Sequence, residues 1–112
     1  MSEPRLKTRL WVQANVRKCN VDGLSATVAR RGDDDAGTVL LKINRLDGGF
    51  TVLAQARTVD GEPAWIRGTG PEPVDEAAAD SYIARQVGRD GDLWVVEIED
   101  REGRMPFGGV IL

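Results

Sequence analysis

The chain has 112 residues, of which 41% are hydrophobic and 29% are charged, and its formal net charge is −3. These values are typical of one globular domain rather than of a disordered or fibrous chain, so we expect a single domain over residues 1–112. With one cysteine and no histidine, the sequence excludes an intrachain disulfide, the usual zinc sites and histidine-dependent catalysis.

Positive charge is concentrated in the first part of the chain. Residues 1–31 contain seven basic and two acidic residues, a balance of +5, so the other 81 residues carry −8. A basic segment of this kind can contact nucleic acid or an acidic partner, or it can pair with acidic side chains of its own chain. We favour the intramolecular pairing because the whole protein is acidic, and we do not expect nucleic acid as a partner.

The apolar runs in the sequence are short. They are about as long as "LWVV" at residues 93–96, far below the roughly 18 residues that a membrane-spanning helix requires. The first 18 residues lack the continuous apolar core and the cleavage site of a secretory signal. We therefore expect a cytoplasmic protein without membrane contacts.

The first half of the chain predicts a helix followed by strands. Residues 11–21 place apolar side chains on one helical face, and Asp22-Gly23 is a typical helix end. Residues 24–31 and 38–44 alternate as strands do, and the turn-rich "GDDDAG" between them predicts that the two strands form a hairpin. Residues 50–57 and 64–67 predict two further strands, each preceded by a glycine-containing turn.

The second half predicts one helix and one strand. Asp75 is a natural N-cap with Glu76 in the first turn, and Gly88 or Gly91 is expected to end this helix. Residues 92–100 alternate as a strand, and the apolar residues 105–112 are expected to dock on the body or on a second subunit. The order α-β-β-β-(β)-α-β predicts an α+β fold with two helices and a mostly antiparallel sheet of four to five strands, covered on one face.

Two groups of carboxylates are the candidates for chemistry. Asp33, Asp34 and Asp35 have the ligand type that Mg²⁺ and Ca²⁺ prefer, but adjacent residues diverge and the calcium-loop spacing is absent. Glu97 and Glu99 lie on one face of a predicted strand, about 7 Å apart, where they could share a metal or divide acid and base roles. We favour a solvated turn for the aspartates and a solvent-facing strand for the glutamates.

No catalytic, metal-binding or cofactor-binding residue is therefore assigned, and no cofactor is expected. The catalytic candidates are Glu97, Glu99 and Asp34, and the metal candidates are Asp33, Asp35 and Glu97. The order of elements is also found in restriction-endonuclease-like nucleases, which need an acidic residue two positions before a lysine. Leu40 stands at that position before Lys42.

Three tryptophans and one cysteine complete the set of notable residues. Trp11 and Trp94 lie on predicted apolar faces and are expected in the core. Trp65 stands on a short strand between glycine-rich turns, and it is our candidate for an exposed contact residue. Cys19 is expected to be buried, although the neighbouring Lys18 could lower its pKa.

Five stretches carry a resemblance to a known family: "WVQANVRK", "ARRGDDDAGTVLLKINR", "PAWIRGTGPEPV", "ADSYIARQV" and "DLWVVEIEDREGR". In this order they resemble a bacterial family of short uncharacterised proteins, domain of unknown function 1491. The resemblance covers nearly the whole chain and implies a cytoplasmic bacterial protein. It implies no activity, cofactor or catalytic residue.

The sequence favours a small non-enzymatic protein-interaction module that binds an unknown protein partner or associates with itself, for example as a homodimer. The expected contact residues, besides the apolar tail, are Trp65, Arg17, Lys18, Arg30 and Arg31. The alternative is a divalent-metal-dependent hydrolase or nuclease-like enzyme that uses Glu97, Glu99 and a loop aspartate.

Overall fold

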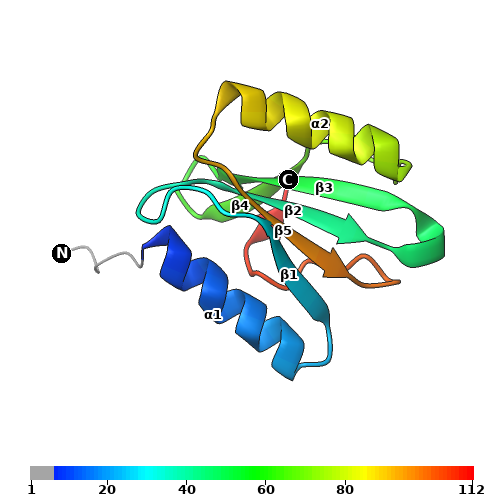
Figure 1. Ribbon diagram of the computed structural model, residues 1–112, viewed down its shortest axis with the longest axis horizontal. Helices are drawn as coiled ribbons and strands as arrows, with labels where there is room; N and C mark the ends of the chain where they lie inside the picture. The colour runs from blue at the N-terminus through cyan, green and yellow to red at the C-terminus, as the bar shows by residue number, and fades with distance from the viewer. Residues whose placement is uncertain (1–6) are drawn as a thin grey trace.

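The computed structural model describes residues 7–112, which form two α-helices and six strands (Figure 1). In chain order the elements are α1 (Thr8–Val21), β1 (Ser25–Arg30), β2 (Val39–Asn44), the 3-10 helix η1 (Leu46–Gly48), β3 (Phe50–Arg57), β4 (Pro63–Arg67), α2 (Glu76–Arg89), β5 (Trp94–Glu99) and β6 (Val110–Ile111). The predicted α+β class is confirmed, with one strand more than expected, because the tail contributes β6.

The six strands form one sheet in the order β1-β5-β2-β3-β4-β6. Pairing is antiparallel for β1 with β5, β2 with β3 and β3 with β4, and it is parallel for β2 with β5 and β4 with β6. The predicted hairpin of β1 and β2 is wrong, because β5 lies between them. Strand β2 is buried on both faces, so it takes a central position with a neighbour on each side, and the residues 31–38 bridge the gap.

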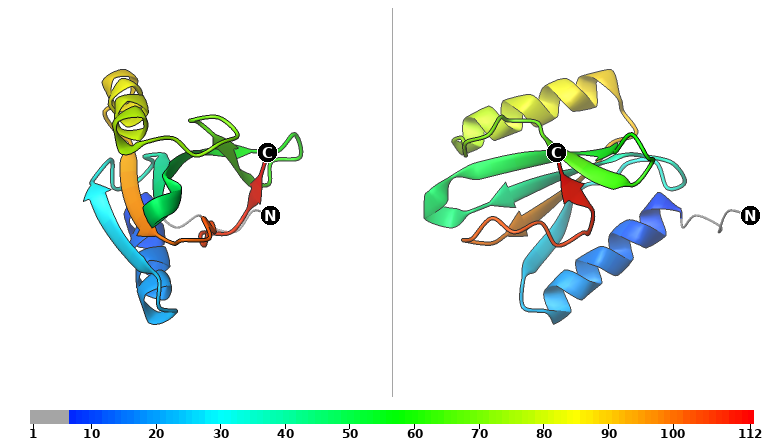
Figure 2. Two further views of the ribbon diagram at one scale, coloured as in Figure 1. Left: turned by 90° about the vertical axis from the view of Figure 1, so that its right-hand side faces the viewer. Right: turned by 180° about the vertical axis from the view of Figure 1, so that it is seen from behind.

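One helix covers each face of the sheet, as the edge-on view in Figure 2 shows. The prediction of a single covered face is therefore wrong. Both faces need a cover because successive apolar residues of β2 and β5 point to opposite faces of the sheet. This alternation gives the sheet two apolar surfaces. Helix α1 covers one surface with Val12 and Cys19, and α2 covers the other with Ala79.

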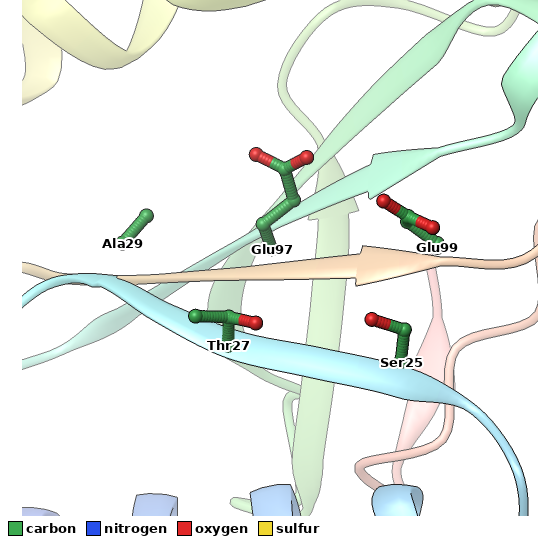
Figure 3. Close-up of a pocket in the computed structure, with 5 residues that line it drawn as sticks. All are labelled: Ser25, Thr27, Ala29, Glu97 and Glu99. Carbon is green, nitrogen blue, oxygen red and sulfur yellow. The ribbon is translucent and has the colours of Figure 1, made fainter.

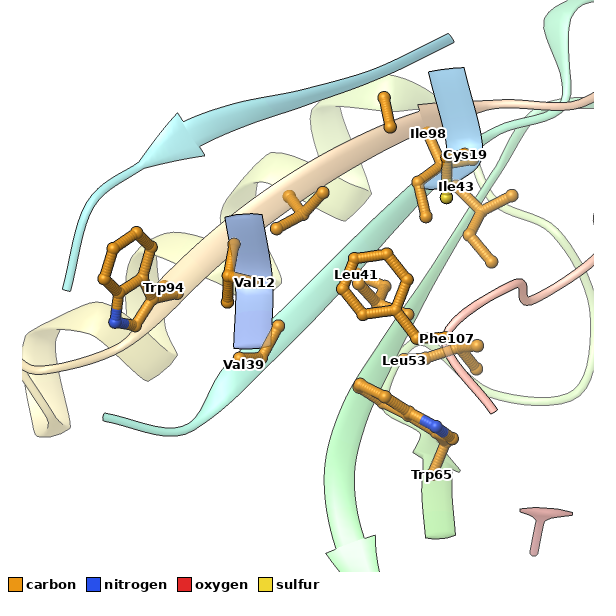
Figure 4. Close-up of a cluster of buried hydrophobic side chains, with 12 residues drawn as sticks. Val12, Cys19, Val39, Leu41, Ile43, Leu53, Trp65, Trp94, Ile98 and Phe107 are labelled. Atoms are coloured by element: carbon orange, nitrogen blue, oxygen red, sulfur yellow. The ribbon is translucent and has the colours of Figure 1, made fainter. Parts of the chain in front are cut away.

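The core on the α1 face is the larger of the two and is shown in Figure 4. It joins side chains from all six long elements of that face with Phe107 from the tail. Trp11, Trp65 and Phe107 form an aromatic cluster, in which Phe107 meets both indole rings edge to face at centroid distances of 5.4 and 6.4 Å. This cluster ties the start of α1 to β4 and to the end of the chain.

Helix α2 begins where the sequence predicts. The Asp75 carboxylate accepts a hydrogen bond from the Ala78 amide at 2.8 Å, which satisfies one of the free amides of the first turn. The helix runs through Gly88 and ends at Arg89, one residue after the first of the two predicted stops and two residues before the second. Tyr82 packs so closely on Gly68 that a Cβ there would lie 2.3 Å from the phenol ring.

The chain after β5 is held by a buried carboxylate. Asp100 is 6% exposed and accepts hydrogen bonds from the Arg104 backbone amide at 2.7 Å and from its guanidinium at 2.9 Å. These bonds with Arg104 lower the pKa of Asp100 from its ordinary value, against the opposing effect of burial. The turn sends the tail across the α1 face, where Phe107 is buried, and on to β6 at the edge of the sheet.

Within residues 7–112, no helix is both long and apolar enough to cross a membrane.

Candidate functional site

The loop of residues 31–37 caps the start of α1. Backbone carbonyls of Asp34 and Asp35 accept hydrogen bonds from the amides of Arg9 (2.9 Å) and Thr8 (3.3 Å). The Asp33 carboxylate bonds the amides of Asp35 and Ala36 and so closes the turn on itself. The predicted turn is confirmed, and its side chains and carbonyls serve local structure.

The two glycines that bracket this turn are required by close packing. A Cβ on Gly32 would lie 2.2 Å from the carbonyl oxygen of Asp92, and a Cβ on Gly37 would lie 2.3 Å from the same atom. The turn also receives a hydrogen bond of 2.7 Å from the Trp94 indole to the Asp33 carbonyl. The segment is therefore clamped to the start of β5 as well as to α1.

Most basic residues near this loop pair within the chain. Lys7 lies 3.5 Å from Asp35, and Asp34 is 3.9 Å from Arg9 and 3.0 Å from Arg31. Arg30 donates hydrogen bonds to the backbone carbonyls of Gly91 and Leu93 instead of pointing into solvent. Two of the predicted contact residues, Arg17 and Lys18, are exposed on α1.

Lys42 is the centre of a charged cluster on the α2 face. Its side chain is 9% exposed, and its ammonium lies 2.8 Å from Asp80, 2.9 Å from Glu76 and 3.6 Å from Glu97. Glu76 and Asp80 come from successive turns of α2, whereas Glu97 is the neighbour of Lys42 across the β2–β5 pair. The ring of Phe50 lies below the ammonium at 5.2 Å. The cluster thus joins α2 to the middle of the sheet.

Protonation of Lys42 follows from this arrangement. Burial alone would lower the pKa of Lys42, but hydrogen bonds to Asp80 and Glu76 and the charge of Glu97 outweigh it and raise the pKa above its ordinary value. An ammonium with a raised pKa stays charged at neutral pH and cannot act as a base or nucleophile there. It neutralises part of the negative charge that surrounds it.

Beside this cluster lies a shallow polar hollow of about 250 Å³. Figure 3 shows Glu97 and Glu99 on β5 beside Ser25, Thr27 and Ala29 on the neighbouring strand β1, with the Glu97 carboxylate directed away from β1. The predicted common face of Glu97 and Glu99 is confirmed by this view. Glu99 is exposed, as expected of a solvent-facing strand, whereas the Glu97 side chain is only 30% exposed because it meets Lys42.

The structure does not assemble the metal site that the alternative hypothesis required. Asp34 and Asp35 pair with residues of the α1 end, whereas Glu97 meets α2 residues on the opposite face of the sheet. Across residues 7–112, no three side chains of Asp, Glu, Cys or His gather in a way that could hold a metal ion. Three carboxylates, those of Glu76, Asp80 and Glu97, surround the Lys42 ammonium instead.

The prediction that Trp65 is exposed is wrong. It is 2% exposed, and its indole donates a hydrogen bond of 2.7 Å to the Gly108 carbonyl. Phe107 of the tail packs edge to face on the ring, which also lies beside Trp11 at a centroid distance of 6.5 Å. The sequence around Trp65, a short strand between glycine-rich turns, predicted an exposed side chain. The residue that accepts the indole hydrogen bond, Gly108, lies 43 residues away along the chain, so the local sequence does not indicate the burial.

Exposed apolar side chains gather instead at the sheet edge around β6. We call this surface the β6 edge and define it by Ile66, Val110, Ile111 and Leu112, which are 50%, 53%, 37% and 58% exposed. Ile66 lies on β4 beside the tail. The sequence prediction missed Ile66 because it assigned the exposed position of this strand to the neighbouring Trp65. The alternation "AWIR" indicates that Trp65 and Ile66 point to opposite faces.

The opposite edge of the sheet is protected. Strand β1 presents the amide and carbonyl of Ala26 away from β5, and the Asn20 side chain bonds both, at 3.0 and 3.2 Å. Helix α1 runs directly into this strand and contacts it. Edge strands that lack such protection are prone to pair with other chains.

A cleft of about 640 Å³ opens on the α1 face, between the start of α1 and the end of the β3–β4 hairpin. Trp11 and Pro63 form part of its lining. Its two charged residues already have partners, because Asp35 pairs with Lys7 and Arg57 donates to the Gly61 carbonyl at 2.7 Å.

Cys19, below α1, is 2% exposed, and burial raises the pKa of its thiol, so the expected lowering by Lys18 does not prevail.

Comparison with known proteins gives a consistent result. The family model described as protein of unknown function, DUF1491, matches residues 6–108. A crystal structure of a DUF1491 family protein from Caulobacter crescentus CB15 is 40% identical, with a TM-score of 0.81 over 95% of this chain and 99% of that one. An NMR structure of a DUF1491 family protein from the same organism, also 40% identical, has a TM-score of 0.79 over 96% and 98% of the two chains.

A solution structure of a protein from A. tumefaciens is 26% identical and covers 86% of each chain with a TM-score of 0.71. Among curated proteins, none matches the sequence. These likenesses extend over nearly the full length of the chain and confirm the resemblance that its sequence motifs carry. The chain belongs to the DUF1491 family of proteins of unknown function.

Proposed function

We propose that this protein is a non-enzymatic protein-interaction module that contacts its partner through the β6 edge. The observation that carries the proposal is the exposure of four large apolar side chains on neighbouring positions of β4 and the tail. Clustered exposed apolar side chains of this kind mark interaction sites, whereas single ones need no explanation. The polar groups of the molecule support this proposal, because Lys42, Asp34 and Asp100 are engaged in pairs that stabilise the fold.

A site-specific photo-crosslinker tests the proposal in the cells from which the protein comes. With p-benzoylphenylalanine at position 112, we expect crosslinked proteins that do not appear when the same residue is placed at position 21. Val21 is a suitable control because it is 79% exposed at the other side of the fold, at the end of α1. Crosslinks from position 112 should also weaken in the variant Ile66→Asp, which puts a charge into the apolar surface. Equal crosslinking from positions 21 and 112 would contradict the proposal.

A further inference from the structure

The backbone of β6 shows how a second strand can add to this edge. The Leu112 amide donates a hydrogen bond of 2.8 Å to the Trp65 carbonyl, so the backbone of Leu112 faces β4. Because successive residues of a strand alternate in direction, the amide and carbonyl of Ile111 face away from the sheet. One donor and one acceptor are therefore presented side by side, as a hydrogen-bonded pair of antiparallel strands requires.

The side chains around Ile111 are complementary to themselves. Val110 is paired with Ala64 and Ile111 with Trp65, so Leu112 lies beside Ile66 on the same face as Val110. Rotating a copy by two-fold symmetry about Ile111 sets Leu112 of each copy opposite Val110 of the other. The result on this face is a continuous apolar row across four strands, formed by Ile66, Leu112, and then Val110 and Ala64 of the second copy.

From these two features, the free backbone groups and the self-complementary side chains, we infer that the partner at the β6 edge is a second copy of this chain, joined by antiparallel pairing of β6 with β6 about a two-fold axis at Ile111. The inference rests on the proposed function, because it names the partner of the same surface. It also assigns a geometry, in which the two sheets continue into one another and Ile111 lies on the symmetry axis.

The exposed area sets the strength of this dimer. The four side chains of the β6 edge expose on the order of 300 Å² of apolar surface per copy, the size of the largest patch on a typical monomer. Two copies bury at most on the order of 600 Å², about half of what stable protein interfaces bury, because edge pairing leaves the faces of the sheet open. The dimer is therefore weak and concentration-dependent, and covalent trapping detects it at low protein concentration.

Disulfide trapping tests the geometry. In a hydrogen-bonded antiparallel pair the facing Cα atoms are about 5.5 Å apart, within the roughly 4.4–6.8 Å that a disulfide spans. Ile111→Cys faces its own copy at this distance, whereas Leu112→Cys faces Val110 and lies about 8 Å from its equivalent. Under mild oxidation with oxidised glutathione, we expect Ile111→Cys to form covalent dimer at least fivefold more than Leu112→Cys. The wild type controls for Cys19, which is buried.

The outcomes separate the inference from the proposed function. Preferential trapping of Ile111→Cys that falls when Ile66→Asp is added would support the dimer, and both substitutions lie at exposed positions that the fold does not need. Equal trapping of the two cysteine variants, or none in either, would overturn it. If the photo-crosslinks from position 112 to another protein then persist, only the identity of the partner is wrong. If those crosslinks are absent as well, the proposed function fails too.

Discussion

Replacing Lys42 by methionine removes the ammonium, which lies over the Phe50 ring, and keeps an apolar side chain of similar length. The variant leaves Glu76, Asp80 and Glu97 close together without their counter-ion. A charge-assisted hydrogen bond contributes about 1.5–3 kcal/mol when it is shielded from water. The carboxylates of Glu76 and Asp80 are 56% and 57% exposed, so water replaces much of what they lose. Removing the buried ammonium also relieves its desolvation.

We therefore expect Lys42→Met to lower the free energy of unfolding at pH 7 by about 1–2 kcal/mol, well below the 3–5 kcal/mol typical of breaking a fully buried pair. The effect depends on pH. The folded-state pKa of Lys42 is raised, so its stabilisation is complete below the unfolded value of about 10.4 and is lost as pH rises through the folded value.

Urea denaturation at pH 7 and in steps above the unfolded-state pKa of about 10.4, followed by tryptophan fluorescence, measures these differences. Arg101→Met is the matched control, because Arg101 pairs with Asp47 at 3.0 Å but both side chains are exposed, at 67% and 94%. We expect this control to differ from wild type by less than about 0.5 kcal/mol. A Lys42→Met variant as stable as wild type at pH 7, or a deficit that does not change with pH, would refute the assignment of Lys42 as the structural counter-ion.

Two further predictions concern the turns. Gly32→Ala should destabilise the protein by about 3 kcal/mol, because its Cβ would meet the Asp92 carbonyl oxygen at 2.2 Å. Gly91→Ala, whose Cβ would meet open space, should be near neutral in the same urea denaturation assay. Asp100→Asn should cost about 1–3 kcal/mol at pH 7. The pKa of Asp100 is lowered in the folded state, so its stabilisation is present above the unfolded value of about 3.9 and is lost as pH falls through the folded value. Unfolding of the Asn variant should therefore depend less on pH in acid, and equal acid sensitivity of the two proteins would contradict the role of the bonds with Arg104.

The features that sequence reasoning predicted depend on neighbouring residues. Asp75 caps α2 through an amide three residues away, and the turn at residues 31–37 closes through Asp33 and its neighbours. The alternation of 94–99 likewise places Glu97 and Glu99 on one face without any knowledge of the rest of the fold. Caps, turns and strand faces can be predicted from one sequence because the interacting groups are close along the chain and the backbone fixes their relative positions.

The features that sequence reasoning missed depend on contacts between distant segments. Strand β5 enters the sheet between β1 and β2, more than fifty residues after both began, and the turn between them has the same composition as a hairpin turn. Trp65 is buried by Gly108 and Phe107, and Lys42 is neutralised by Glu76, which follows 34 residues later. Burial at these positions depends on contacts between distant segments of the chain. The alternation of apolar and polar residues along one strand does not predict those contacts.

Sedimentation velocity over a series of protein concentrations tests the central claim that two copies join at the β6 edge. Wild-type protein should move from the mass of one chain towards that of two as concentration rises, whereas Leu112→Asp should remain a single chain at every concentration. Val21→Asp, which adds the same charge at the end of α1, should behave like wild type. Single-chain behaviour of the wild type up to millimolar concentration, or equal association of wild type and Leu112→Asp, would contradict the account.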